Sequence, residues 1–203
     1  MSTVHFLNHP WFQLKFLTVS PLAQLTAPSE RTALDLLLER AGVFRPWPAG
    51  PRNSDRLPHL KAYLDMPGRG PRSRFCDGSF RMVHAGSTAA TCRAEVAFHH
   101  GQALRDSAEP PGAVRIFELL GLHAAGRFQD VRAGHPELYR PDDYGPSQAF
   151  GATCKSAGEP GILYRSARRK DGECLGILAA TAVKSCALKD LVALRWDGER
   201  LGI

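Results

Sequence analysis

An arginine and a glutamate 21 residues apart are the residues of this chain best suited to chemistry. Arg74 opens a glycine-containing turn, residues 74–80 (RFCDGSF), and Glu95 follows in a run of small residues. A guanidinium group matches the oxygens of a phosphate through paired hydrogen bonds. A carboxylate stabilises positive charge that develops in a transition state. The two residues together therefore suit a phosphate-bearing substrate that reacts through a cation.

The hydrophobic pattern predicts the elements that must position this pair. Residues 88–99 have an apolar face with helical spacing, which predicts a helix that carries Glu95. Residues 80–84 predict a short strand that ends at His84. Residues 101–112 contain two adjacent prolines and no periodicity, so an exposed loop is expected there. Residues 114–119 alternate between apolar and polar side chains, as a strand does.

The second half of the chain predicts a helix over residues 147–157 and strands over 161–164 and 174–178, joined by a charged turn at 168–172. A last strand is expected at 191–195. Towards the N-terminus, residues 29–42 predict a capped helix and residues 57–66 a shorter one. Strands mixed with helices in no regular alternation favour an α+β fold. We expect one domain over 1–203, with a helical and loop portion at 1–66 and a core at 70–200.

Composition limits the class of protein. The chain has 203 residues, 43% hydrophobic and 23% charged, which suits one globular domain. Its apolar runs are far shorter than the roughly 20 residues of a membrane helix, and its N-terminus has no signal-peptide pattern, so a cytoplasmic protein is expected. The five cysteines are widely spaced and form no C-x-x-C motif. This spacing predicts reduced thiols rather than disulfides, and no metal site is expected.

The net charge of +6 is uneven, because its basic excess falls in residues 51–100 and 151–203. Such an excess can attract a nucleotide, a nucleic acid or an acidic protein partner. The chain contains neither G-x-G-x-x-G nor G-x-x-x-x-G-K-[ST]. The sequence therefore predicts neither a Rossmann nor a P-loop nucleotide site.

Three segments near the C-terminus carry a more specific pattern: residues 144–148 (YGPSQ), 161–168 (GILYRSAR) and 172–174 (GEC). With them the chain resembles the RES-domain family, the toxins of a class of bacterial toxin–antitoxin pairs. Arg74, Glu95, Ser147 and Ser166 fall on the family pattern in order. The resemblance covers residues 70–200, and His84 stands where the family often has a tyrosine.

The resemblance implies an ADP-ribosyltransferase-like fold of mixed or antiparallel sheets flanked by helices. It implies that NAD is a substrate and not a cofactor, consumed by hydrolysis, by phosphorolysis or by transfer of ADP-ribose to a protein. It also implies a partner, an Xre-type antitoxin with a helix-turn-helix DNA-binding region. The toxin itself is not expected to contact nucleic acid.

Cleavage of the nicotinamide–ribose bond develops an oxocarbenium-like cation, as in glycoside hydrolysis. On this chemistry Glu95 is the catalytic carboxylate that stabilises the cation, and Arg74 binds the diphosphate. Ser147, at a helix start, and Ser166 are expected to orient a phosphate or ribose oxygen. Nicotinamide is a flat cation that favours aromatic walls. The expected wall residues are Phe75, His84 and Tyr144.

Two alternatives remain open at this level. The basic balance together with His84, His99 and His100 also fits a nucleic-acid-binding or RNA-cleaving toxin, although no basic stripe with interleaved aromatics stands out. A non-enzymatic interaction domain is the other. A metal role for His99 and His100 is not expected, because adjacent residues on a helix point apart.

Overall fold

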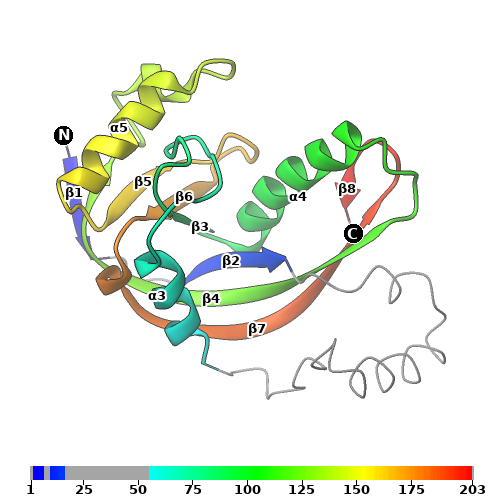
Figure 1. The fold of residues 1–203 in the computed structure, drawn as a ribbon, viewed down its shortest axis with the longest axis horizontal. Coiled ribbons are helices and arrows are strands. Elements are labelled where there is room, and N and C mark those ends of the chain that lie inside the picture. Colours follow the sequence, from blue (N-terminus) through cyan, green and yellow to red (C-terminus); the bar gives the residue numbers. More distant parts are fainter. Residues whose placement is uncertain (1, 7–9, 17–54, 203) are drawn as a thin grey trace.

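A long strand, β4 (Val114–Asp130), runs through the molecule and pairs with four other strands. The computed structural model describes residues 2–6, 10–16 and 55–202 of the chain. β7 (Val183–Trp196) is antiparallel to β4 along most of its length, and the two form the curved ribbon at the base of Figure 1. β2 (Trp11–Phe16) pairs with the first half of β4 and β1 (Ser2–Phe6) with the second half.

The remaining strands close the sheet on itself. β5 (Gly161–Arg165) lies parallel to the end of β4, and β6 (Glu173–Ile177) is antiparallel to β5. β3 (Val83–Gly86) pairs with β6 along its length and meets β2 at one position, where Phe12 faces Gly86. The short β8 (Leu201–Gly202) extends the sheet beyond β7. Within the described residues this is one mixed sheet of eight strands.

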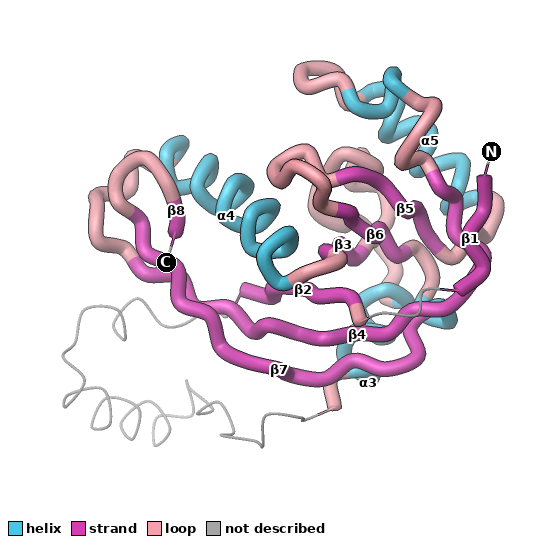
Figure 2. Tube along the Cα trace, turned by 180° about the vertical axis from the view of Figure 1, so that it is seen from behind, coloured by secondary structure: helices cyan, strands magenta, loops and turns pink. Residues whose placement is uncertain are grey.

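Three α-helices of the described chain pack around this sheet: α3 (Leu57–Asp65), α4 (Ala89–Asp106) and α5 (Gly145–Ser156). Two 3-10 turns, η1 (Pro136–Tyr139) and η2 (Ala180–Ala182), complete the described elements. Figures 1 and 2 show α4 and α5 at opposite ends of the molecule, with β3, β5 and β6 between them. The predicted α+β fold, with a mixed sheet flanked by helices, is confirmed.

Residues 101–106 correct one expectation, because they continue α4 where a loop was predicted. Tertiary contacts explain the extension. Gly101 faces the Trp196 ring and β8, and Arg105 donates a hydrogen bond to the Glu199 carbonyl oxygen at 2.8 Å. The helix then ends just before Ala108, whose φ of 51° leaves the helical region. A glycine that packs against a neighbouring strand does not end a helix.

The other predictions fare differently along the chain. The helix predicted at 57–66 and the strands at 161–164 and 174–178 are confirmed as α3, β5 and β6. The strand predicted at 80–84 is displaced to Val83–Gly86, so His84 lies within β3 rather than at its end. The strand expected at 191–195 is the second half of β7. The helix expected at 29–42 lies outside the described residues.

The buried side chains form three clusters, and one of them supports the region of the predicted chemistry. That cluster joins the turn after Arg74 to α5, β5 and β6. Its members include Phe75, Phe80, Met82, Ile162 and Tyr164. In the part of the chain that the structure describes, no helix is long and apolar enough to cross a bilayer.

Candidate active site

A cavity of about 320 Å³ lies between α4, β3 and the segment that leads into Arg74. Its volume is at the lower end of the roughly 300–1,000 Å³ typical of pockets for small molecules. Arg74 and Glu95 both line it, although they come from different elements. The residues predicted to act together therefore share one cavity. His84 and Tyr144 line the same space.

Helix α4 reaches this cavity because its start is tightly fixed to β3. The Thr88 hydroxyl caps the helix by accepting a hydrogen bond from the Thr91 backbone N–H at 3.0 Å. Gly86, at the end of β3, lets the two backbones approach closely. A Cβ at Gly86 would lie 2.7 Å from the Cys92 backbone nitrogen. Glu95 follows one turn after Thr91 and so faces the cavity beside β3.

The Glu95 carboxylate is held in place by the turn between β5 and β6. Its Oε1 atom accepts hydrogen bonds from the Ser166 hydroxyl at 2.6 Å and from the Ala167 backbone N–H at 3.1 Å. The two donors fix the position of this carboxylate oxygen. The Ser166 hydroxyl in turn accepts hydrogen bonds from the backbone N–H groups of Arg168 and Arg169. Ser166 thus orients Glu95. The sequence had predicted instead that Ser166 contacts a phosphate or ribose oxygen of the substrate.

Arg74 lies half-buried on a tight turn in which Ser73 and Cys76 pair through their backbones. One terminal nitrogen of its guanidinium, Nη1, donates to the carbonyl oxygens of Leu138 at 3.1 Å and Arg140 at 3.2 Å. The group also stacks over the Tyr144 ring, 4.7 Å from its centre. These contacts fix the plane of the guanidinium at the cavity wall. No hydrogen bond is recorded between its other nitrogens and the described residues.

The first turns of α5 hold the backbone of the Arg74 turn. The Ser147 hydroxyl donates to the Arg74 carbonyl oxygen at 2.6 Å, and the Gln148 side-chain amide donates to the Ser73 carbonyl oxygen at 2.9 Å. Gly151 permits this approach, because a Cβ there would collide with the Phe75 carbonyl oxygen. Ser147 has no exposed surface. Its expected contact with substrate is therefore corrected: its hydroxyl is buried and positions the Arg74 backbone.

Phe75 requires a second correction. Its side chain is fully buried and packs against Tyr164, with ring centres 4.8 Å apart, and against Phe150 at 6.4 Å. It cannot form a wall for nicotinamide, because it points into the core and not into the cavity. Its burial instead turns Arg74, its neighbour in sequence, outward.

His84 links β3 to the Arg74 turn through a chain of hydrogen bonds. Its Nδ1 lies 2.9 Å from the Tyr164 hydroxyl and its Nε2 lies 3.0 Å from the Ser73 hydroxyl. Burial lowers the pKa of His84 to about 4, and the charge of His99 adds to this effect. Burial also raises the pKa of Tyr164 well above its usual range. At neutral pH both side chains are therefore uncharged.

Two cysteines, Cys92 and Cys174, line this cavity. All five cysteines of the chain are buried free thiols. Cys174 lies closest to the carboxylate, with its sulfur 3.9 Å from Glu95 Oε1. Burial and the neighbouring Glu95 charge raise the Cys174 pKa, which keeps the thiol protonated. Across the described residues, no group of three or more His, Cys, Asp or Glu is placed to hold a metal ion.

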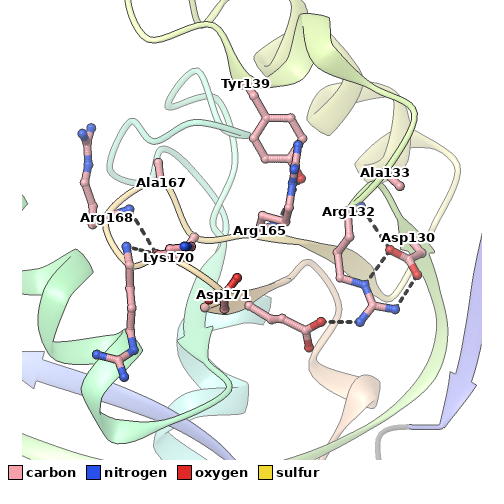
Figure 3. Close-up of a pocket in the computed structure, with 13 residues that line it drawn as sticks. Asp130, Arg132, Ala133, Tyr139, Arg165, Ala167, Arg168, Lys170 and Asp171 are labelled. Carbon is pink, nitrogen blue, oxygen red and sulfur yellow. Dashed lines mark hydrogen bonds and ion pairs between the residues drawn. The ribbon is translucent and has the colours of Figure 1, made fainter.

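A second hollow, of about 1030 Å³, lies on the other side of the β5–β6 turn (Figure 3). Arg132 crosses its floor and forms ion pairs with Asp130 at 2.7 Å and Glu173 at 2.6 Å. The turn itself contributes Arg168, Arg169 and Lys170 to the rim, so cations outnumber carboxylates around the hollow. Ser166 and Ala167 line it through the same turn that holds Glu95.

Two arginines at this hollow are fixed on aromatic rings. The Arg165 guanidinium lies over the Tyr139 ring at 4.7 Å, and the Arg168 guanidinium lies over the Phe98 ring at 3.4 Å. Stacking leaves the edge of a guanidinium available for carboxylate or phosphate oxygens. Arg168 also lines the cavity that holds Glu95. The β5–β6 turn therefore forms a basic ridge between the two hollows.

Sequence reasoning missed the roles of three residues. Gln148 and Tyr164 were part of recognised segments, but their long-range partners, Ser73 and His84, could not be found from local patterns. His99 was considered as a metal ligand and as part of a nucleic-acid site, but not as a partner of Glu95. It lines the cavity one helical turn after Glu95, and the i,i+4 spacing was the signal that could have paired them.

Comparisons with known proteins identify the family and the fold. The family model described as RES domain matches residues 45–197. Among solved structures, the chain is similar to one in the crystal structure of the MbcT–MbcA toxin–antitoxin complex of M. tuberculosis. The TM-score is 0.52 and the identity 12%, over 95% of this chain and 87% of that chain. At this identity the likeness concerns the fold. No curated protein matches the sequence.

Proposed function

The chain belongs to the RES-domain family, and from this premise we propose that it is a toxin that cleaves the nicotinamide–ribose bond of NAD. NAD is the substrate, and ADP-ribose passes to a hydroxyl of a protein, to water or to phosphate. One observation carries the proposal. A fixed carboxylate, Glu95, and an oriented guanidinium, Arg74, face one cavity of a size that suits a small molecule.

Glu95 supplies the electrostatic part of the reaction. As the bond between C1′ and the nicotinamide nitrogen breaks, both bonding electrons leave with nicotinamide and the ribose gains positive charge. A carboxylate that is already oriented by Ser166 and Ala167 stabilises that charge without reorganising at the moment of reaction. Oε1 is held by these donors. The ribose is expected on the Oε2 side of the carboxylate.

Arg74 supplies the binding part. Its Nη1 is held by two carbonyl oxygens and its face rests on Tyr144. The remaining nitrogens are proposed to bind the diphosphate of NAD. A prearranged guanidinium loses little entropy on binding and forms charge-assisted hydrogen bonds to phosphate oxygens. Of the three wall residues expected for nicotinamide, Tyr144 and His84 line the cavity. These two are the proposed aromatic contacts of the nicotinamide ring.

The test is release of nicotinamide from NAD by the purified protein and by Glu95→Gln. Glutamine keeps an oxygen that accepts from Ser166 and Ala167, but it lacks the charge that stabilises the cation. We expect the variant to lose at least about 10²-fold in kcat, the scale of removing one electrostatic stabiliser. Glu109→Gln is the matched control, because this carboxylate pairs with Arg115 and lines neither hollow.

The outcomes separate the candidate functions. Equal turnover by Glu95→Gln and wild type would remove Glu95 from the mechanism. A modified protein in cell extract, detected as a mass increase, favours transfer, whereas free ADP-ribose or its phosphate favours degradation. Intact NAD together with RNA binding that weakens steeply with salt would favour the nucleic-acid alternative.

A cognate antitoxin is the proposed partner. A solved structure with a similar fold comes from a toxin–antitoxin complex, which supports a partner of that kind. The basic ridge of Arg168, Arg169 and Lys170 separates the cavity that holds Glu95 from the second hollow. An acidic surface on the antitoxin would complement it and would cover the entrance of NAD.

A further inference from the structure

The two oxygens of the Glu95 carboxylate have different surroundings. Oε1 accepts from Ser166 and Ala167, as described above. Oε2 lies 4.0 Å from His99 Nε2, one turn further along α4. The His99 side chain is 59% exposed and lines the same cavity. An imidazole therefore stands at the side of the carboxylate where the ribose is proposed to bind.

Burial, helped by two nearby guanidinium groups, favours the neutral form of the His99 imidazole. Burial lowers its pKa most, and the facing guanidinium groups of Arg168 and Arg74 lower it further, while Glu95 raises it. The nearby His84 and His100 also have lowered pKa values, so neither adds a charge at neutral pH. The net result is a pKa below 6.5. A neutral imidazole at pH 7 can accept a proton, which a protonated one cannot.

We propose that His99 is the general base for hydroxyl acceptors in this cavity. The inference rests on the proposed cleavage of NAD and names the class of acceptor that needs the residue. As C1′ parts from nicotinamide, the oxygen of water or of a protein alcohol bonds to C1′ and its proton passes to His99 Nε2. Nicotinamide leaves as the neutral base, and the imidazolium later returns its proton to solvent.

The pairing with Glu95 suits this role. Once protonated, His99 lies beside a carboxylate, so the imidazolium is stabilised by the group that stabilised the ribosyl cation moments earlier. Inorganic phosphate behaves differently from a hydroxyl. It is already an anion at neutral pH and can attack C1′ without losing a proton. The residue is therefore required for attack by water or an alcohol and dispensable for attack by phosphate.

The experiment compares wild type, His99→Gln and His100→Gln as full-length proteins. NAD cleavage is followed as nicotinamide release from pH 5 to 8, in phosphate-free buffer and with added inorganic phosphate. Wild type is expected to slow on the acid side with a midpoint below 6.5, as His99 takes up its proton. Without phosphate, His99→Gln should lose about 10²- to 10⁴-fold, the usual contribution of a general base, and should lose the acid limb.

The control and the phosphate arm decide between a chemical and a structural role. His100 also lines the cavity, but its ring packs edge-on against Phe117, and it is His99 that pairs with Glu95 Oε2. His100→Gln should therefore keep the loss of rate at acid pH. With phosphate, His99→Gln should approach the rate of wild type, and thermal unfolding should show that it is folded. Equal losses in both arms, or an acid limb that survives in His99→Gln, overturn the proposal. A wild-type protein that leaves NAD intact refutes the proposed function instead, and this role with it.

Discussion

Replacing Ser166 by alanine tests the idea that the β5–β6 turn orients Glu95, the carboxylate proposed to be catalytic. The substitution removes a hydroxyl that donates to Glu95 Oε1 at 2.6 Å and leaves the Ala167 N–H as the remaining hydrogen-bond donor from the turn. A hydrogen bond to a charged group contributes about 1.5–3 kcal/mol. Since about 1.4 kcal/mol corresponds to a factor of ten, kcat/KM for NAD should fall about 10- to 100-fold.

The structure also limits what else this substitution changes. The Ser166 hydroxyl accepts the backbone N–H groups of Arg168 and Arg169, and both residues are exposed. Water can replace these two hydrogen bonds, so the free energy of unfolding should fall by no more than about 1 kcal/mol. For a chain of this size that loss lowers Tm by roughly 2–4 °C. The variant should therefore be folded at the temperature of the assay.

The assay is the initial rate of nicotinamide release over a range of NAD concentrations. A residue that orients Glu95 acts where charge develops in the transition state, so the loss should appear in kcat with little change in KM. A Ser166→Ala variant with wild-type kcat/KM would refute the reasoning. A loss confined to KM would also refute it, because it would mean that Ser166 binds the substrate directly.

Two further predictions concern stability and partner binding. His84 has a pKa of about 4 when folded and about 6.5 when unfolded, so the unfolded chain takes up its proton first and stability falls as pH drops from 6.5 to 4. At pH 4.5 this costs about 2–3 kcal/mol relative to pH 7. Urea unfolding should show this fall in the free energy of unfolding of wild type between pH 6.5 and 4, and a smaller fall in His84→Gln. The same pH dependence in both proteins would contradict the prediction. In the ridge, the double substitution Arg169→Glu and Lys170→Glu should weaken antitoxin binding at least about tenfold in calorimetry, while nicotinamide release continues. Unchanged binding would place the antitoxin elsewhere.

The candidate site was predictable from sequence to the extent that its chemistry is carried by residue types in a recognisable order. Arg74, Glu95 and Tyr144 were expected at the site, and the structure lines one cavity with them. Phe75 and Ser147 were also expected there. Both residues lie next to the site, but their side chains are buried and support the Arg74 turn. A motif identifies which residues matter, and burial decides whether they contact substrate or position those that do.

Local periodicity failed where a distant element decided the conformation. Residues 101–106 lack a helical pattern, yet they remain helical because Gly101 packs beside Trp196 and Arg105 bonds to the Glu199 carbonyl. The strand of His84 likewise starts three residues and ends two residues later than predicted, because its register is set by pairing with β6. Local secondary-structure propensity predicts conformation poorly wherever such long-range contacts decide it.

The amino-acid sequence alone indicated the α+β class, through periodicity, and the RES-domain family, through residue types in a fixed order. It also singled out Glu95 and Arg74 as a carboxylate and a guanidinium that could act together. These are properties that can be seen along the chain without its tertiary structure. The tertiary structure alone decided that Ser166, 71 residues after Glu95, orients its carboxylate, and that His99 stands beside the other oxygen. Closure of the sheet brings α4 and the β5–β6 turn together, and long-range register of this kind is set by packing rather than by any local pattern.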